Sequence, residues 1–99
     1  MAEQNTILND VKLALRISHN LLDNEIEDVI ASARQELIRA GVDASVANAD
    51  TELVVMAIKT YAMEYYTRDV KEADRFSISF KYQCDNLRKT YPSGGGLDV

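Results

Sequence analysis

The residues with intrinsic chemical reactivity are few and lie far apart along the chain. Cys84 is the only cysteine and His19 the only histidine. A nucleophilic cysteine needs a base beside it, and an ordinary metal site needs several suitable ligands. Because the sequence offers neither arrangement, we expect no catalytic site, no metal site and no bound cofactor. Cys84 is then a small buried hydrophobic residue, and His19 is a loop side chain.

The carboxylates are numerous, but their spacing is that of a helix surface. Glu25, Glu27, Asp28 and Glu36 fall on the polar side of an amphipathic pattern. Acid–base catalysis instead needs carboxylates in a cleft, in environments that separate their pKa values. The sequence also contains no HExxH, GxSxG or phosphate-loop motif. It therefore favours a protein that binds other macromolecules over an enzyme.

The charge is spread unevenly along the chain. Sixteen acidic and eleven basic residues give a net charge of −5. Proteins that bind the phosphates of nucleic acids instead carry clustered lysine and arginine residues. Residues 20–52 hold eight acids and two bases, and residues 53–99 hold six acids and seven bases. This division favours head-to-tail contacts between copies. Solvated helix surface with chance clustering is the alternative interpretation.

Length and composition predict one all-α domain, a small bundle of three to four helices. The 99 residues suffice for a single core. No apolar run reaches the ~20 residues of a membrane span, and the polar residues 1–5 do not resemble a secretion signal. We therefore expect a protein that is made in the cytoplasm and has no membrane partner. Residues 1–91 form the helical domain, and residues 92–99, with three consecutive glycines, form a flexible tail.

Apolar residues at intervals of three and four predict the helices. A first short helix covers residues 6–16, and a clear second one has its apolar face at residues 22–37 and ends near Gly41. Residues 42–49 fit one helical turn. The third helix runs to about residue 67 and is apolar on most sides, which marks it as the central helix. The expected N-caps are polar residues that precede these runs: Asn5 or Thr6, Ser18 or Asn20, Asp43, and Asn48 or Asp50.

The C-terminal third has a mixed pattern. Residues 68–75 alternate in charge, which favours a solvated loop or a fraying helix end. Phe76, Ile78 and Phe80 alternate with serines as in a strand, but from Phe80 onward the apolar spacing is helical. We predict a last helix over residues 79–90, entered through an extended stretch. Whether residues 76–80 are extended or helical stays open.

Three tyrosines of the third helix have two possible roles. Beside lysine and arginine they can stack nucleic-acid bases. Tyr61 and Tyr65 lie on the apolar stripe, however, and are better interpreted as lining the edge of the core. Tyr66 falls off the stripe and is a better candidate for contact with a partner.

The opening of the chain resembles a known protein family. Residues 11–17 read VKLALRI, and residues 23–34 read DNEIEDVIASAR. This order of a short helix, a capping stretch and an acidic helix resembles the head–tail connector (adaptor) proteins of tailed bacteriophages and prophages. With a looser match in the later helices, the resemblance covers residues 6–91, and the tail from Gly94 to Val99 lies outside it.

The resemblance implies a structural protein of the virion head–tail junction, made in the bacterial host cytoplasm. The implied partners are other copies in a ring, dodecameric on the portal, the portal protein itself, and a tail-completion or stopper protein. DNA would pass through the ring without sequence-specific binding. We expect the acidic second helix to face the basic C-terminal half of the neighbouring copy. The candidate interface residues are Glu25, Asp28, Glu52, Tyr66, Arg68, Lys71, Arg75 and Arg88.

Two other functions stay open. A small helical DNA-binding regulator or packaging factor would use a recognition helix, for which residues 81–89 are the best basic segment. No partner helix and tight turn clearly precede that segment. A helical adaptor unrelated to phages is the third possibility.

Overall fold

The computed structural model describes residues 6–93 and is all-α, as predicted. An isolated antiparallel bridge between Val42 and Pro92 is the only β pairing among these residues. The domain is flat, with principal extents of 46 × 38 × 18 Å. Its helices are α1 (Thr6–Leu15), α2 (Asp23–Arg39), the single turn α3 (Ala44–Ala47), α4 (Glu52–Tyr66) and α5 (Val70–Thr90).

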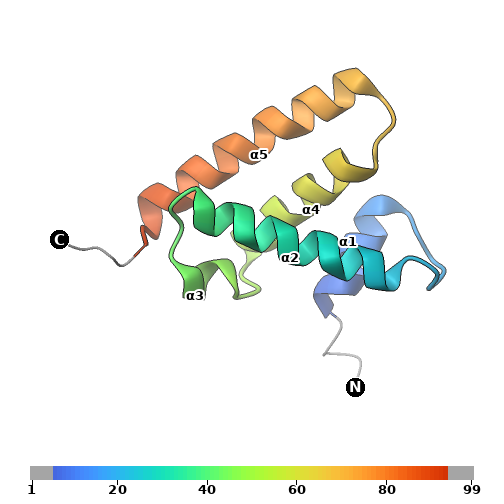
Figure 1. Ribbon diagram of the computed structural model, residues 1–99, viewed down its shortest axis with the longest axis horizontal. Helices are drawn as coiled ribbons and strands as arrows, with labels where there is room; N and C mark the ends of the chain where they lie inside the picture. Colours follow the sequence, from blue (N-terminus) through green and yellow to red (C-terminus); the bar gives the residue numbers. More distant parts are fainter. Residues whose placement is uncertain (1–5, 94–99) are drawn as a thin grey trace.

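Helix α4 lies at the centre, as its nearly continuous apolar surface predicted. It packs against α1, α2 and α5, and α4 and α5 run antiparallel (Figure 1). Val54, Ala57, Ile58 and Ala62 are fully buried on it. Thr60 is also buried, and its hydroxyl donates to the Met56 carbonyl at 3.0 Å. The other helices therefore share one core built around α4.

A partly buried ion pair holds α1 against the start of α2. Lys12 is 8% exposed, and its Nζ lies 2.7 Å from Asp23 Oδ1. The same ammonium donates to Asn20 Oδ1 at 2.8 Å. The prediction that Ser18 or Asn20 caps α2 was wrong, because Leu22 occupies the N-cap position and makes no side-chain bond there. The side chain of Asn20 accepts the hydrogen bond from Lys12 instead.

The ends of α1 and α2 have the same backbone arrangement. Arg16 and Gly41 both adopt positive φ, 62° and 106°. In each case the positive-φ residue and the one after it donate back to the last turn of the helix, which closes a Schellman-type end. Gly41 was expected in this role. Asn5, one of the predicted caps of α1, lies outside the described residues, and Thr6 is the first helical residue rather than a cap.

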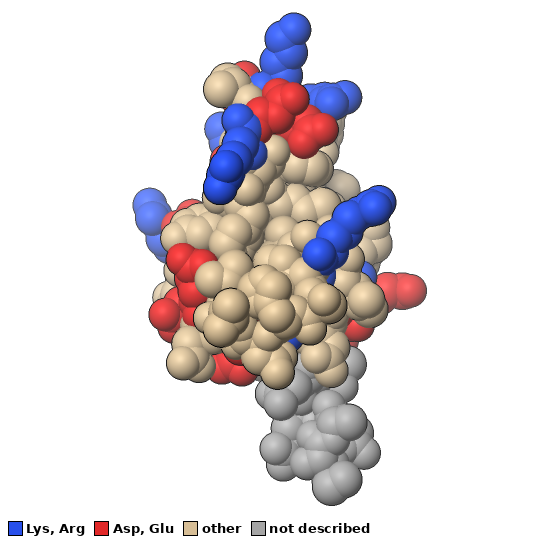
Figure 2. Space-filling model, turned by 90° about the vertical axis from the view of Figure 1, so that its right-hand side faces the viewer, with Lys and Arg blue, Asp and Glu red and all other residues tan. Residues whose placement is uncertain are grey.

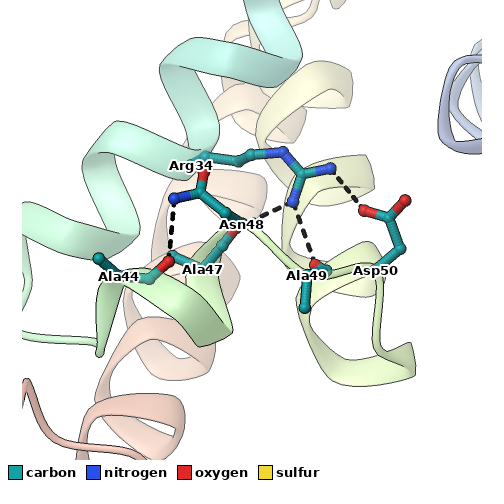
Figure 3. A network of polar contacts seen from close by, with 6 residues as sticks. All are labelled: Arg34, Ala44, Ala47, Asn48, Ala49 and Asp50. Atoms are coloured by element: carbon teal, nitrogen blue, oxygen red, sulfur yellow. Dashed lines mark hydrogen bonds and ion pairs between the residues drawn. The ribbon is translucent and has the colours of Figure 1, made fainter.

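Arg34 fixes the connection from α3 to α4 (Figure 3). Its guanidinium donates to the carbonyls of Ala47 and Ala49 at 2.9 and 3.1 Å and pairs with Asp50 at 2.6 Å. Since Asp50 is engaged here and Asn48 bonds to the carbonyl of Ala44, neither caps α4.

Two further caps complete these connections. Thr51 stands at the N-cap position of α4. Asp43 caps α3 by accepting from the Ser45 amide at 3.1 Å, as predicted. The polar residues around α3 therefore organise a tight corner, and the cap of α4 comes one residue later than expected.

The C-terminal third differs from the prediction. Only residues 68 and 69 of the segment 68–75 lie in a loop, and residues 76–80 are not extended, because α5 is one continuous helix from Val70 to Thr90. Asp69 starts it by accepting from the amides of Lys71 and Glu72 at 2.9 and 3.2 Å. A strand at 76–80 would have had no described strand to pair with, whereas a helix satisfies its backbone internally.

The chain after α5 is tied back to the α2–α3 corner. The amide of Asp43 donates to the Tyr91 carbonyl, and the amide of Ser93 donates to the Gly41 carbonyl, both at 2.8 Å. Residues 92 and 93, the first of the expected flexible tail, are thus held in place. Residues 94–99 lie outside the described part.

Candidate interaction surfaces

A groove of about 480 Å³ runs between the C-terminal half of α2 and helix α5. Tyr61 of α4 lines it together with Phe80, Cys84, Glu36 and Glu64. A second hollow of about 280 Å³ continues past Tyr61 towards the start of α2. The second hollow is lined by Glu25, Asp28, Val29, Ser32, Tyr61 and Tyr65. We call the two hollows together the tyrosine groove.

The groove combines aromatic surface with negative charge at the start of α2, where Glu25 and Asp28 line it. Between α2 and α5 its lining contains both acidic and basic side chains. The rings of Tyr61 and Phe80 pack with centroids 5.2 Å apart. Burial, then the carboxylates of Glu36 and Glu64, raises the pKa of the Tyr61 hydroxyl. The phenol therefore stays neutral, and it offers a hydrogen-bonding group on an apolar floor. Such a surface suits a partner that presents apolar side chains and positive charge.

Cys84 contributes to the floor of the groove without being reactive. The thiol is 7% exposed, and burial, followed by the nearby Glu36, raises its pKa to about 11. Because the thiolate is the nucleophile, this environment suppresses reactivity at neutral pH. His19 is exposed, and its Nδ1 accepts from the Leu21 amide at 3.2 Å.

The outer face of α5 is the second candidate surface. Phe80, Cys84 and Leu87 turn towards the core, so Ile78 and Tyr82 point away from it, with exposures of 60% and 70%. None of residues 70–79 is buried. Figure 2 shows lysine and arginine side chains projecting where α4 turns into α5, at the top of the view, with carboxylates between them and a broad uncharged area below.

The predicted interface residues fall into separate groups. Glu25 and Asp28 line the tyrosine groove, while Glu52 is exposed at the first turn of α4, after α3 and away from the start of α2 (Figure 1). Tyr66 donates within the chain to Glu25 at 2.8 Å. These acidic candidates are thus not one patch.

The basic candidates are also divided. Arg68, Lys71 and Arg75 are exposed together around the α4–α5 turn. Arg88 lies near the other end of α5, pairs with Asp85, and its side chain lies against Gly41. Within the described part of the chain, no ion pair forms at Arg68, Lys71 or Arg75, whereas Arg88 is paired with Asp85.

Sequence analysis named Glu25 and Asp28, which line the groove, but it did not predict the groove itself or the exposed apolar pair Ile78 and Tyr82. The prediction of an extended stretch at 76–80 concealed the pair, because a strand pattern places Ile78 on the same side as Phe80. The helical spacing that begins at Ala73 and continues through Phe80 and Leu87 was the available signal. It would have placed Ile78 opposite the core.

The basic segment at residues 81–89 is the C-terminal half of a 21-residue helix. Arg88 and Lys89 both pair with Asp85, with the Lys89 distance at 3.1 Å. Helix α5 does follow α4 after the short connection of residues 67–69. A recognition helix, however, reads bases with its N-terminal residues and keeps its basic side chains available. The arrangement lacks the features of a helix–turn–helix reader.

Metal sites and membrane-spanning helices are the remaining features to consider in residues 6–93. Histidine, cysteine and carboxylate side chains nowhere gather in a group of three or more that could hold a metal ion. In the same residues no helix is both long enough and apolar enough to cross a membrane.

Comparison with known proteins gives one match. No curated protein and no solved structure matches the chain. The family model described as "Phage connector protein" matches residues 7–86, which span α1 to α4 and most of α5. The match covers far more than half of the chain and includes both candidate surfaces. The chain therefore belongs to the phage connector protein family and has a structural connector role.

Proposed function

We propose that copies of this chain assemble head to tail into a ring at the head–tail junction of a phage or prophage virion. The ring sits on the portal protein with twelve copies, extends the DNA channel, and gives a tail-completion or stopper protein its platform. The subunits are made in the bacterial host cytoplasm and assemble there. Family membership supports the connector role.

The observation that carries the proposal is that one domain exposes carboxylates and basic side chains on different elements. Carboxylates line the groove beside the start of α2. Arg68, Lys71 and Arg75 are exposed around the start of α5, where they alternate with Asp69, Glu72 and Asp74. Surfaces that differ in this way fit heterologous contacts, which close into rings when the rotation between copies is suitable. The excess of acid also suits a DNA conduit, because an acidic wall does not retain the passing duplex.

The test is charge reversal across the proposed contact. Asp28→Lys and Arg75→Glu should each weaken assembly, and the double variant should partly restore it. Light scattering over a concentration series, with and without the portal protein, gives the assembled mass. Arg16→Glu, at an exposed site at the end of α1 that lines neither hollow of the groove, is the matched control. A wild-type protein that stays monomeric even with the portal would overturn the ring, and unchanged masses in both single variants would overturn the pairing.

A further inference from the structure

The outer face of α5 has the pattern of a docking helix. Lys71, Arg75, Ile78 and Tyr82 recur at intervals of four, three and four, so their side chains share one face of the helix. Asp74, four residues before Ile78, is exposed at the border of this face. Ile78 and Tyr82 are large, adjacent and mostly exposed. An apolar pair with basic residues at one end is the arrangement that a helix uses to enter an apolar groove with an acidic rim.

The tyrosine groove offers the complementary surface. Tyr61 and Tyr65 lie side by side along it, and Tyr65 is 57% exposed. Glu25 and Asp28 stand on the α2 side of the same hollow. Apolar floor and carboxylate rim thus occur together, and the basic and apolar parts of the α5 face are likewise adjacent. Charge complementarity identifies a second copy of the chain as the occupant.

The two surfaces are distinct parts of one subunit. The groove opens between α2 and α5. Ile78 is 60% exposed and lies on a different face of α5 from the buried Phe80, Cys84 and Leu87. One copy can therefore present its α5 face to a neighbour while it receives another neighbour in its groove. Contacts of this kind are heterologous and continue from copy to copy.

We propose that the outer face of α5 docks in the tyrosine groove of the next copy. Ile78 and Tyr82 cover Tyr61 and Tyr65, and Lys71 and Arg75 approach Glu25 and Asp28. This inference rests on the self-assembly proposed above and names the surfaces that carry it.

The first experiment removes the apolar anchors without touching the core. Ile78→Gln and Tyr82→Gln should each raise the concentration of half-assembly about tenfold, since burying a large apolar side chain is worth that factor or more. Leu21→Gln is the matched control, because Leu21 is 87% exposed on the α1–α2 connection. Circular dichroism checks that each variant stays helical.

The second experiment blocks the acceptor side. Ser32 is exposed and lines the groove, so Ser32→Arg places bulk and positive charge where the neighbouring helix should lie. Assembly should fall by at least the same factor. Ala31→Arg, on an exposed neighbouring site of α2, should have a smaller effect.

Disulfide trapping then tests which surfaces meet. In a Cys84→Ala background, chains with Tyr65→Cys are mixed with chains carrying Ile78→Cys and are oxidised. Cross-links between the two kinds of chain are expected, and links within one kind are not. Normal assembly of the Ile78 and Tyr82 variants would overturn this interface. Cross-links that form only between chains carrying the same cysteine would overturn it as well. Neither result would contradict the ring proposed above. Absence of any wild-type assembly with the portal would defeat both proposals.

Discussion

The hydroxyl of Tyr66 donates a hydrogen bond of 2.8 Å to Glu25 Oε1, and 41 residues separate the two along the chain. This bond ties the end of α4 to the first turns of α2. Burial and the Glu25 carboxylate raise the pKa of Tyr66, so the phenol remains a donor over the whole physiological range. Sequence analysis placed both residues at a subunit interface, and within the monomer they position each other.

Removal of this hydroxyl tests its contribution to stability. Tyr66→Phe should lower the free energy of unfolding by about 1 kcal/mol, the usual net value of one such bond. Tyr65→Phe is the control. The ring of Tyr65 packs edge-on against Tyr66, and its hydroxyl makes no hydrogen bond within residues 6–93. Urea unfolding followed by circular dichroism measures both. Equal losses in the two variants would contradict the assignment.

Arg34 should matter more than its position on a helix surface suggests. Arg34→Lys keeps the charge but cannot reach two carbonyls and Asp50 at once, and we expect a loss of about 2 kcal/mol. Arg39→Lys provides the comparison, since Arg39 is 77% exposed and pairs only with Glu36 at 3.3 Å. That substitution should change stability by less than about 0.5 kcal/mol. A similar effect of the two substitutions would show that the Arg34 contacts contribute little.

The paired helix ends of α1 and α2 predict changes of opposite sign. Arg16→Gly should stabilise the domain by roughly 0.5 kcal/mol, because glycine adopts positive φ without the penalty of a side chain. Gly41→Ala should destabilise it by about 2 kcal/mol, since φ is 106° and the new Cβ would lie 2.8 Å from Arg88 Cδ.

Thermal unfolding midpoints give both effects. Combining Gly41→Ala with Arg88→Ala separates the contributions, because the second change relieves the collision and leaves the backbone strain. A Gly41→Ala protein as stable as the wild type would show that this turn tolerates a side chain.

Cys84 predicts a dependence of stability on alkaline pH. Its pKa rises from the ordinary 9.0 to about 11 in the folded chain. Between these values the unfolded chain loses the thiol proton and the folded chain keeps it, so the free energy of unfolding falls as pH rises. The effect is absent below about pH 9 and complete above about pH 11.

Comparison with Cys84→Ala isolates this contribution. Urea unfolding at pH 8 and pH 10.5 should show a steeper loss of stability in the wild type than in the variant. The tyrosines titrate in both proteins and cancel in the difference. Parallel losses would mean that the thiol does not titrate differently on folding.

Local rules of sequence accounted for most of the fold. The apolar spacing of α2 and α4, the positive φ of Gly41 and the Asp43 cap follow from periodicity and backbone sterics. The start of α5 was not predicted in this way. Its mixed charges and alternating serines obscure the helical spacing, and the helix depends on packing against α4. The cap of α4 shifted because Arg34 recruits Asp50.

The candidate surfaces were harder to foresee. Asp28 and Arg75 can be recognised as charged and exposed from sequence, but the groove exists only where α2, α4 and α5 diverge in space. Long-range packing decides which acidic residues line the same hollow. Glu52 illustrates this limit of sequence-based prediction, because nothing in its charge indicates that it lies apart from Glu25.

The anchoring of Ser93 to Gly41 has a mechanical consequence. It fastens the C-terminal end of α5 to the α2–α3 corner, whereas no residue from 70 to 79 is buried. Phe80, Cys84 and Leu87 hold the following turns in the core. With about 1.5 Å of rise per residue, residues 70–79 span roughly 15 Å, and we expect any adjustment of α5 to a neighbour to occur in that stretch.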